Sequence, residues 1–412
     1  MELSHDQEII VKDVSSIISM YSRGRGKQVV GIGGYAGTGK TQIIPDLIKL
    51  IKYHSDTKFF SAAIATYTGK AASVIKDRFN MNLNIDVGYI GTIHGLIYKP
   101  KFEYDSVKKK SVIVGWDKHL NIPYDVIIID EASMVGYKTW NDLLSYGIPI
   151  VAIGDHGQLP PVENDNFKTF NLMSNPDFKL EKIHRQALNN PIISLSSYVR
   201  KHGHIPYGIS DDKKVFKLHW DEELCQRTYN KVNVFDDTIT ILCGFNSTRI
   251  GVNKAIRKRL NYKKEIPYPG ERVICLQNNH SSGIMNGQTG TIMWLTVIDK
   301  FLYRTTIEMD GDYTYSTAIN RQVFNDKDSS NTDRFSGFNH IVKRKLRNEG
   351  IDNYDFFDYA YAITVHKSQG SEWNRIILFE EKHPRWDSEY YMRWLYTGIT
   401  RAKEKLFVIG FD

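Results

Sequence analysis

The sequence predicts an α/β protein with a parallel sheet in each half of the chain. Apolar runs that lack polar alternation are typical of strands covered on both faces, and such strands belong to parallel sheets flanked by helices. In the first half, the predicted strands are 28–34, 58–66, 124–130 and 148–155, and the predicted helices between them are 41–54 and 69–79. In the second half, similar apolar runs lie at 237–245, 375–379 and 405–411.

Two segments interrupt this α/β pattern. Residues 97–118 lose the alternation and carry basic and aromatic side chains, which predicts a small hairpin. Residues 271–319 contain β-rich stretches separated by glycine and Asn-Gly, so we expect an all-β insertion within the second unit. The polar stretch 325–337 is expected to form a mobile loop. Ser247 is expected to cap the basic helix that follows 237–245.

Composition narrows the class of protein. The 412 residues are 41% hydrophobic and 25% charged, which is typical of a globular chain with more than one domain. The chain has no apolar run of the roughly 18 residues that would cross a bilayer, and MELSHDQEII has no basic region followed by an apolar stretch. We therefore expect neither a membrane protein nor a secreted one. Its three cysteines form no CxxC pair, so we expect a reducing compartment, the cytoplasm.

Clusters of basic residues indicate a possible polyanionic partner. The net charge is +7, and residues 249–264 carry seven cations and no acid. Further clusters lie at 343–347 and 108–110, and 12% of the residues are aromatic. Such clusters favour a nucleic-acid-binding groove, while solvated helix faces are the alternative for each cluster taken singly.

The segment GYAGTGKT at 34–41 is the strongest chemical signal. It lies directly after a predicted strand and before a predicted helix, the context in which G-x-x-x-x-G-K-[ST] binds phosphate. Its glycines allow backbone N–H groups to face a phosphate, Lys40 reaches the β and γ phosphates, and the Thr41 hydroxyl binds Mg²⁺. We therefore expect ATP and Mg²⁺ as cofactors. The loop residues expected to contact the nucleotide are Gly34, Ala36, Gly37, Thr38, Gly39, Lys40 and Thr41.

Two later strand ends supply polar groups that suit phosphoryl transfer to water. The segment IIIDEAS at 127–133 places Asp130 to hold Mg²⁺ and Glu131 to polarise a water. The segment AIGDHGQLPPV at 152–162 places Gln158 to sense the γ-phosphate or to orient that water. Each segment alone could be a solvated strand end or a simple turn.

These motifs, in this order, resemble superfamily 1 helicases, and more closely their RecD/Dda-like branch. Within that branch the chain resembles a phage-type DNA helicase. The segments that carry the rest of the resemblance are ATYTGKAA (65–72), GTIHGLI (91–97), LEKIHRQ (180–186), MNGQTGTI (285–292), YAITVHKSQGSEW (361–373) and YTGITRAKEKL (396–406). One departure is Tyr35, which stands where members of the family commonly have proline.

The resemblance implies two RecA-like motor domains of the P-loop NTPase class. The first, 1A, would span 1–187, with 97–118 as the duplex-splitting hairpin 1B. The second, 2A, would span 188–275 and 358–412, with an SH3-like insertion, 2B, at 276–357. The implied activity is ATP-dependent unwinding of DNA in the 5′ to 3′ direction, driven by opening and closing of the cleft between the motor domains. An RNA helicase, a translocase that does not unwind, and a helicase subunit of a larger recombination or repair complex remain open alternatives.

The resemblance also implies roles for single residues. Gln7 would read adenine, Arg185 and Arg401 would stabilise the transferring phosphoryl group, and Gly370 would contribute to the nucleotide site. The expected strand-binding residues are Thr66, Lys70, Thr92 and His94 in the first motor domain and Thr364, His366 and Lys367 in the second. Each of these taken singly could be a helix cap or a surface residue. The implied partners are single-stranded DNA and tailed duplex DNA, with single-stranded-DNA-binding or replication proteins as further partners. We expect a monomer that does not bind membranes.

Overall fold

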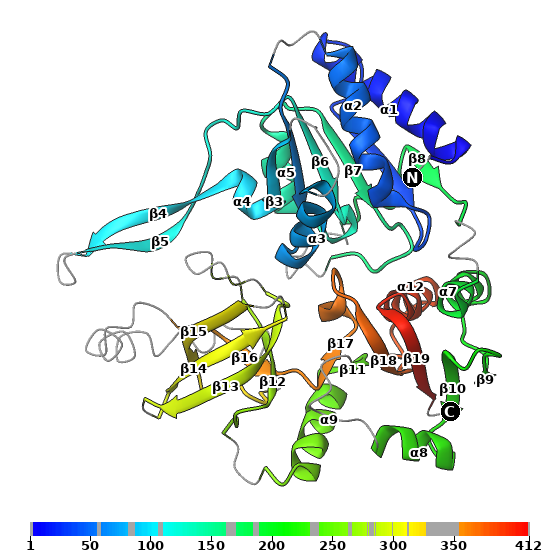
Figure 1. Cartoon of the computed structure of the whole chain (residues 1–412), viewed down its shortest axis with the longest axis vertical. Coiled ribbons are helices and arrows are strands. Elements are labelled where there is room, and N and C mark those ends of the chain that lie inside the picture. The colour runs from blue at the N-terminus through cyan, green and yellow to red at the C-terminus, as the bar shows by residue number, and fades with distance from the viewer. Residues whose placement is uncertain are drawn as a thin grey trace. The chain divides into compact units, whose positions relative to one another are not determined.

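The computed structural model describes most of the chain (Figure 1). The described residues are 3–55, 59–80, 87–105, 110–161, 170–183, 189–230, 239–262, 266–277, 279, 284, 286–298, 300–310, 313–326 and 354–410. The contacts group the chain into two compact units. The first unit comprises 1–99, 116–204 and 387–400, and the second comprises 100–115, 205–386 and 401–412.

The first unit is built on a six-stranded sheet with the strand order β3-β2-β6-β7-β1-β8. Its strands are β1 (Val29–Gly34), β2 (Ala62–Thr66), β3 (Val87–Thr92), β6 (Val126–Asp130), β7 (Ile150–Gly154) and β8 (Phe178–Leu180). All the pairs within it are parallel. The parallel α/β sheet predicted from the apolar runs is therefore confirmed, and β2, β6 and β7 begin two to four residues later than those runs.

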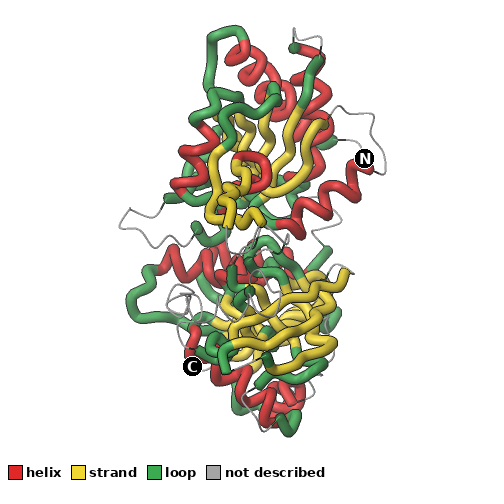
Figure 2. The backbone as a smooth tube through the Cα atoms, turned by 90° about the vertical axis from the view of Figure 1, so that its left-hand side faces the viewer, coloured by secondary structure: helices red, strands yellow, loops and turns green. Residues whose placement is uncertain are grey.

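Helices cover both faces of this sheet (Figure 2). They are α1 (His5–Ser22), α2 (Ile44–His54), α3 (Gly69–Asn80), α4 (Ile93–Ile97) and α5 (Tyr137–Leu144). The first unit also contains α7 (Pro191–His202) and α12 (Ser388–Ile399). Alternate residues of one strand point to opposite faces. Ile128 packs in the cluster that contains α1 and α2, whereas Ile127 and Ile129 pack in the cluster that contains α4 and α5. This double coverage explains why the strands are apolar throughout.

The helix expected at 41–54 has a different first turn. Lys40–Ile43 forms a short 3₁₀ helix, η1, and the α-helix α2 begins only at Ile44. Pro45 lies in the first turn of α2. A proline is tolerated there because it has no N–H to donate, whereas deeper in a helix it would break a hydrogen bond.

The interruption at 97–118 forms a two-stranded sheet, as predicted for a hairpin. Its strands are β4 (Tyr98–Asp105) and β5 (Lys110–Lys118), seen as the long cyan pair in Figure 1. The side chains of 100–116, which include the candidate wedge aromatics, lie outside the described residues. The role of this hairpin in splitting a duplex stays a prediction.

The second unit contains a second six-stranded sheet, with the strand order β17-β11-β18-β19-β10-β9. Its strands are β9 (Gly208–Ile209), β10 (Val215–His219), β11 (Ile239–Cys243), β17 (Ala362–Thr364), β18 (Trp373–Phe379) and β19 (Ala402–Gly410). They pair in parallel except for β9, which is antiparallel to β10. The helices α8 (Glu223–Asn230) and α9 (Asn246–Arg259) belong to this unit.

The predicted all-β interruption is confirmed as an antiparallel sheet with the strand order β15-β14-β13-β12-β16. Its strands are β12 (Arg272–Cys275), β13 (Thr289–Val297), β14 (Leu302–Met309), β15 (Tyr313–Asn320) and β16 (Phe357–Tyr359). The sheet thus includes residues on both sides of 276–357. The SH3-like description and the domain boundaries stay predictions, and residues 327–337 of the expected mobile loop lie outside the described residues.

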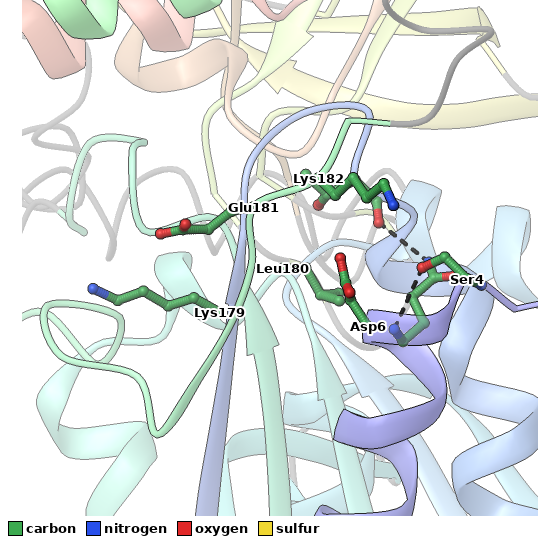
Figure 3. A pocket seen from close by; sticks show the side chains of 8 residues that line it. Ser4, Asp6, Lys179, Leu180, Glu181 and Lys182 are labelled. Atoms are coloured by element: carbon green, nitrogen blue, oxygen red, sulfur yellow. Dashed lines mark hydrogen bonds between the residues drawn. The ribbon is translucent and has the colours of Figure 1, made fainter.

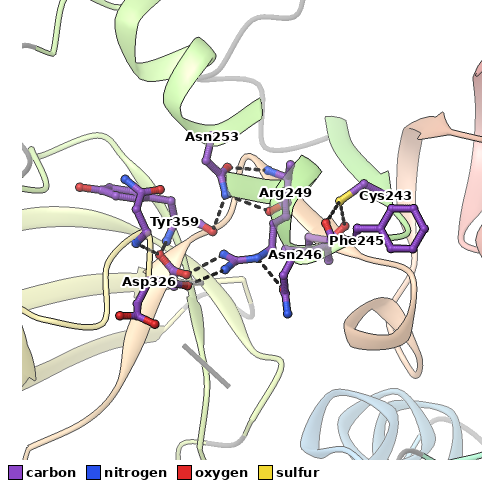
Figure 4. Close-up of polar contacts among 11 residues, drawn as sticks. Cys243, Phe245, Asn246, Arg249, Asn253, Asp326 and Tyr359 are labelled. Atoms are coloured by element: carbon purple, nitrogen blue, oxygen red, sulfur yellow. Dashed lines mark hydrogen bonds and ion pairs between the residues drawn. The ribbon is translucent and has the colours of Figure 1, made fainter. Parts of the chain in front are cut away.

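The basic helix α9 is anchored by buried cations rather than exposed along its whole length. Arg249, only 2% exposed, donates through Nη1 to Asp358 Oδ2 at 2.6 Å (Figure 4). Arg257 donates to Glu271 Oε1 at 2.7 Å, and the Asn253 side chain bonds the backbone of Tyr359 and Ala362. Two of the seven cations in 249–264 are therefore structural, which corrects their assignment to a nucleic-acid groove.

The start of α9 also differs from the prediction. The helix begins at Asn246, one residue before Ser247. The Glu381 carboxylate accepts hydrogen bonds from the N–H groups of Gly244 and Phe245, at 2.6 and 3.2 Å. A negative charge at a helix N-terminus is favourable. Glu381, from a distant segment, therefore caps the start of the helix in place of Ser247.

Replacing Arg249 by methionine should destabilise the second unit. The substitution leaves the Asp358 carboxylate buried without its cation, and loss of one partner from a buried pair costs about 3–5 kcal/mol. Urea unfolding measures the change. Arg227→Met is the matched control, because Arg227 forms an exposed pair with Glu223 and should shift the midpoint little. Equal shifts for the two variants would contradict the buried pair.

Candidate functional site

The candidate site lies at the carboxyl edge of the first sheet. In the parallel register, Gly33 lies opposite Gly154, and Thr66 lies opposite Asp130. The segments that leave β1, β6 and β7 must therefore emerge side by side. Ligands of parallel α/β sheets bind at this edge. The register thus brings together the three motifs that the sequence assigned to phosphate chemistry.

The loop at 34–41 has the backbone that its glycines predict. Gly37 and Gly39 have φ angles of 81° and 75°, in the left-handed region that side chains disfavour. At Gly34 the limit is space, because an added Cβ would lie 2.7 Å from Thr38 Oγ1 and 2.9 Å from Lys40 Cγ. Lys40 Nζ donates to the Tyr35 carbonyl at 3.0 Å. The Lys40 ammonium is therefore folded back over the loop that would hold a phosphate.

Thr41 and Asp130 are adjacent, as a magnesium site requires. Thr41 Oγ1 donates to Asp130 Oδ2 at 2.9 Å, and the Asp130 side chain is buried. Mg²⁺ is held in such sites by one or two protein oxygens together with phosphate and water oxygens. A hydroxyl and a carboxylate at this spacing fit that ligand set, so these two residues could hold the metal ion.

Glu131 follows Asp130 in a strained backbone conformation. Its φ of 57° lies in the left-handed region, which costs about 1–3 kcal/mol for a residue other than glycine. Its N–H donates to Asp130 Oδ1 at 3.0 Å. Strain of this kind persists where the surrounding structure imposes it. Here the strained residue lies at the end of β6, directly after Asp130.

The third motif contributes Asp155 and Gln158. Asp155 is 1% exposed, and its Oδ1 accepts from the Gly157 N–H at 2.9 Å. Its Oδ2 lies 3.5 Å from Lys40 Nζ. Gln158 is 5% exposed, and its Oε1 has no hydrogen-bond partner among the described residues. A buried amide oxygen of this kind can accept a hydrogen bond from a water, as the role assigned to Gln158 requires.

An aromatic and cationic cluster, unforeseen as a site, borders the loop at 34–41. The Arg200 guanidinium carbon lies 3.3 Å from the centre of the Tyr35 ring. Tyr35 also packs against His156 and Tyr396. Burial, together with the charges of Lys179, Lys40 and Arg200, lowers the pKa of His156, so its imidazole is neutral. Tyr396 and Asp155 lie inside motifs already recognised in the sequence, whereas nothing local distinguishes Arg200.

A cavity of about 400 Å³ adjoins the loop at Thr38 (Figure 3). Its lining residues are Ser4, Asp6, Gln7, Thr38, Lys179, Leu180, Glu181 and Lys182. Gln7 Nε2 donates to the Thr38 carbonyl at 3.3 Å, and Gln7 Oε1 accepts from the Ser4 N–H at 2.9 Å within a capping box. Gln7 therefore ties α1 to the loop, and its predicted contact with adenine stays a prediction.

The strand-binding candidates of the first unit have different surroundings. Thr66 is fully buried and donates to the Thr68 carbonyl at 2.7 Å, so its hydroxyl is used internally. Thr92 caps α4 by accepting from the Gly95 N–H at 3.1 Å. The His94 ring lies 4.5 Å from that of Tyr98. Lys70 lies on α3, but its side chain is outside the described residues.

The candidates of the second unit gather after β17. Thr364 ends β17 and accepts from the Lys367 N–H at 3.4 Å. Burial lowers the pKa of His366 to about 4 and that of Lys367 to about 8. His366 is therefore neutral near pH 7, whereas Lys367 is mostly a cation.

The predicted nucleotide contacts Gly370 and Arg401 follow strands of the second sheet. Gly370, with a φ of 71°, follows the short helix η3 (His366–Ser368). Arg401 is 4% exposed and donates to the Ser371 carbonyl at 3.2 Å. Both belong to the second unit. Arg185 lies outside the described residues.

Two family models match the sequence. The model described as "AAA domain" matches residues 20–164, and the model described as "UvrD-like helicase C-terminal domain" matches residues 359–409. The first match contains the loop at 34–41, Asp130 and Asp155. The second contains the cluster after β17 and Arg401. Among the described residues, the helices are too short or too polar to cross a membrane.

Relatives match nearly the whole chain. The ATP-dependent RecD2 DNA helicase of Deinococcus radiodurans is 23% identical over 93% of this chain and 47% of its own length. The RecBCD enzyme subunit RecD of Buchnera aphidicola is 27% identical over 92% of this chain and 69% of its own length. The chain thus spans about half the length of the first relative. These matches confirm the predicted resemblance to RecD-like helicases.

A solved structure shares the fold. The Pif1 helicase from Bacteroides, solved in complex with ADP-AlF3 and single-stranded DNA, superposes with a TM-score of 0.51 at 17% sequence identity. The alignment covers 99% of this chain and 92% of the Bacteroides chain. The architecture of the two sheets therefore recurs in a solved structure that differs widely in sequence.

Replacing Gly34 by alanine should weaken phosphate binding while the fold survives. The added Cβ collides with the Thr38 and Lys40 side chains, so the loop must move. We expect affinity for a fluorescent ATP analogue to fall about 100-fold, and fluorescence titration measures it. Gly251→Ala is the control, because an added Cβ there meets no atom within 4 Å. Unchanged affinity in Gly34→Ala would show that the loop tolerates the collision.

Proposed function

We propose that this chain, a RecD/Pif1-like member of the superfamily 1 helicases, is an ATP-dependent DNA helicase that uses Mg²⁺. The observation that carries the proposal is the contact of Thr41 with Asp130, 2.9 Å apart at the edge of the sheet from which the phosphate-binding loop emerges. The segments that carry Lys40, Glu131 and Gln158 leave the sheet at the same edge, which supports hydrolysis of a nucleoside triphosphate.

The proposed hydrolysis divides the work among five side chains. Lys40 and the amides of its loop bind the β and γ phosphates, and Thr41 and Asp130 hold Mg²⁺, which neutralises phosphate charge when bound. Glu131 accepts a hydrogen bond from the attacking water and Gln158 orients that water. Glu131 directly follows Asp130 at the end of β6, which supports assigning the two carboxylates to one site.

We further propose that two arginines complete the site during turnover. Arg401 in the second unit, together with Arg185, supplies positive charge to the transferring phosphoryl group. An ATP held by Lys40 in the first unit and Arg401 in the second draws the units together, and hydrolysis releases them. DNA bound to both units is then moved along in steps. The proposed direction, 5′ to 3′, rests on the family branch.

The proposed strand contacts use groups that bind phosphate without reading sequence. These groups are Thr66, Lys70, Thr92, His94, Thr364, His366 and Lys367. Lys367 is a mostly protonated cation beside the end of β17, so it can attract a phosphate. Single-stranded DNA and tailed duplex are the proposed substrates of a monomer. The Buchnera relative is named as a subunit of RecBCD, which supports subunit membership as the alternative.

Duplexes with a single-stranded tail test the function. With ATP and Mg²⁺, the protein should open a duplex that carries a 5′ tail and leave a 3′-tailed duplex closed, as gel separation of the strands would show. Lys40→Ala should open neither, because it removes the phosphate-binding cation. Opening of only the 3′-tailed duplex would refute the direction. DNA-stimulated hydrolysis without any opening would indicate a translocase or a subunit that requires its partner.

Strand binding should weaken as pH rises through about 8. Burial and the nearby Arg249 lower the pKa of Lys367 to about 8, so its charge is present below that pH and is lost above it. Affinity for a labelled oligothymidine should therefore fall several-fold from about pH 7 to about pH 9 at constant ionic strength. Fluorescence anisotropy measures it. Lys367→Arg should remove the fall, because guanidinium stays charged, and an identical fall in that variant would exclude Lys367.

A further inference from the structure

Tyr396 links helix α12 to two parts of the nucleotide site. Its side chain is fully buried. Its hydroxyl donates to Asp155 Oδ2 at 2.7 Å, and the same oxygen accepts the Ala36 N–H at 2.8 Å. One hydroxyl thus joins the third motif to the phosphate-binding loop. Both contacts lie within the first unit.

The Asp155 carboxylate stands where a negative charge opposes ATP binding. Its Oδ2 is the same oxygen that lies 3.5 Å from Lys40 Nζ. Opposite charges this close attract strongly when they are buried, so Asp155 competes with phosphate for the Lys40 ammonium. A carboxylate beside a polyphosphate also repels it. Other groups must therefore hold the Asp155 carboxylate in place when ATP binds.

The Tyr396 hydroxyl and the Gly157 N–H are suited to this restraint. Each donates to one oxygen of the Asp155 carboxylate, at 2.7 and 2.9 Å. Burial and the charge of Asp155 raise the pKa of Tyr396 well above its ordinary value, so the hydroxyl keeps its proton. The ring is held separately, edge-on to Tyr35 with centres 6.1 Å apart and 5.8 Å from the Arg200 guanidinium carbon. The ring can therefore stay in place without its hydroxyl.

We propose that Tyr396 is a positioning residue for ATP binding: its hydroxyl holds the Asp155 carboxylate so that Lys40 is available to phosphate, and its oxygen fixes the loop at Ala36. This inference rests on the proposed ATPase function. It also links the loop to the segment that carries Arg401, since α12 ends at Ile399, two residues before that arginine. A movement of the phosphate-binding loop at Ala36 would thereby reach α12 through the Tyr396 hydroxyl.

Tyr396→Phe separates the hydroxyl from the ring. Without the donated hydrogen bond, Asp155 pairs more closely with Lys40, so the KM for ATP should rise about tenfold while kcat changes less than about threefold. Tyr391→Phe is the matched control on the same helix, where the Tyr391 ring stacks on Trp394. It should leave both constants unchanged. An unchanged KM in Tyr396→Phe would overturn the proposal.

The double variant Tyr396→Phe with Asp155→Asn distinguishes restraint of the Asp155 carboxylate from a packing role of Tyr396. Asp155→Asn removes the competing charge, so in the Tyr396→Phe background it should return the KM to within about threefold of the parent value. Added defects in the double variant would instead assign Tyr396 a packing role and refute the proposal. If Tyr396→Phe unfolds at a lower temperature, the single variant Asp155→Asn serves as the test instead. The proposal predicts that Asp155→Asn binds ATP as tightly as the parent or more tightly.

Measuring the binding of a fluorescent ATP analogue separates a failure of this inference from a failure of the proposed function. A parent protein that binds no ATP would refute the proposed function itself. A parent that binds ATP, with Tyr396→Phe binding equally well, would refute only the role of Tyr396. The expected result is a parent that binds and a Tyr396→Phe variant that binds about tenfold more weakly.

Discussion

The parallel register of β1, β6 and β7 is the constraint on which the rest of the site depends. Because β1 lies beside β7 with Gly33 opposite Gly154, the phosphate-binding loop and Asp155 must leave the sheet at the same edge. The pairing of β2 with β6 places Asp130 at that edge too. Residues more than a hundred positions apart are thus brought within hydrogen-bond distance by backbone pairing alone, before any side chain contributes.

Buried charged side chains have different roles in the two units. In the first, Asp130 accepts a hydrogen bond from the Thr41 hydroxyl, and Asp155 lies 3.5 Å from the Lys40 ammonium that a phosphate would also bind. In the second, Arg249 and Arg257 are matched by Asp358 and Glu271 and serve packing. Buried carboxylates and cations therefore serve the candidate site in one unit and packing in the other, and only the groups around them distinguish the two roles.

Local pattern was sufficient for the phosphate-binding loop and for the strands β1, β2, β6, β7, β11, β18 and β19. It did not reveal β3, β8, β9, β10 or β17. Strands covered on both faces are apolar throughout, and the loop needs glycines at fixed spacing, so both leave a signal in a short window. The role of Tyr396 and the stacking of Arg200 on Tyr35 join segments far apart, so no local window could reveal them. Ser247 failed as a cap for the same reason, because Glu381 reaches the start of α9 from more than 130 residues away.

The Arg401→Ala variant tests the proposal that Arg401 stabilises the phosphoryl group transferred from ATP. The account predicts that this variant binds a fluorescent ATP analogue within about threefold of the parent, because the loop and Lys40 are intact. It predicts that DNA-stimulated hydrolysis falls about 1,000-fold, since the cation that stabilises the transferring phosphoryl group is gone. Hydrolysis at the parent rate would contradict the account and assign Arg401 to its contact with Ser371.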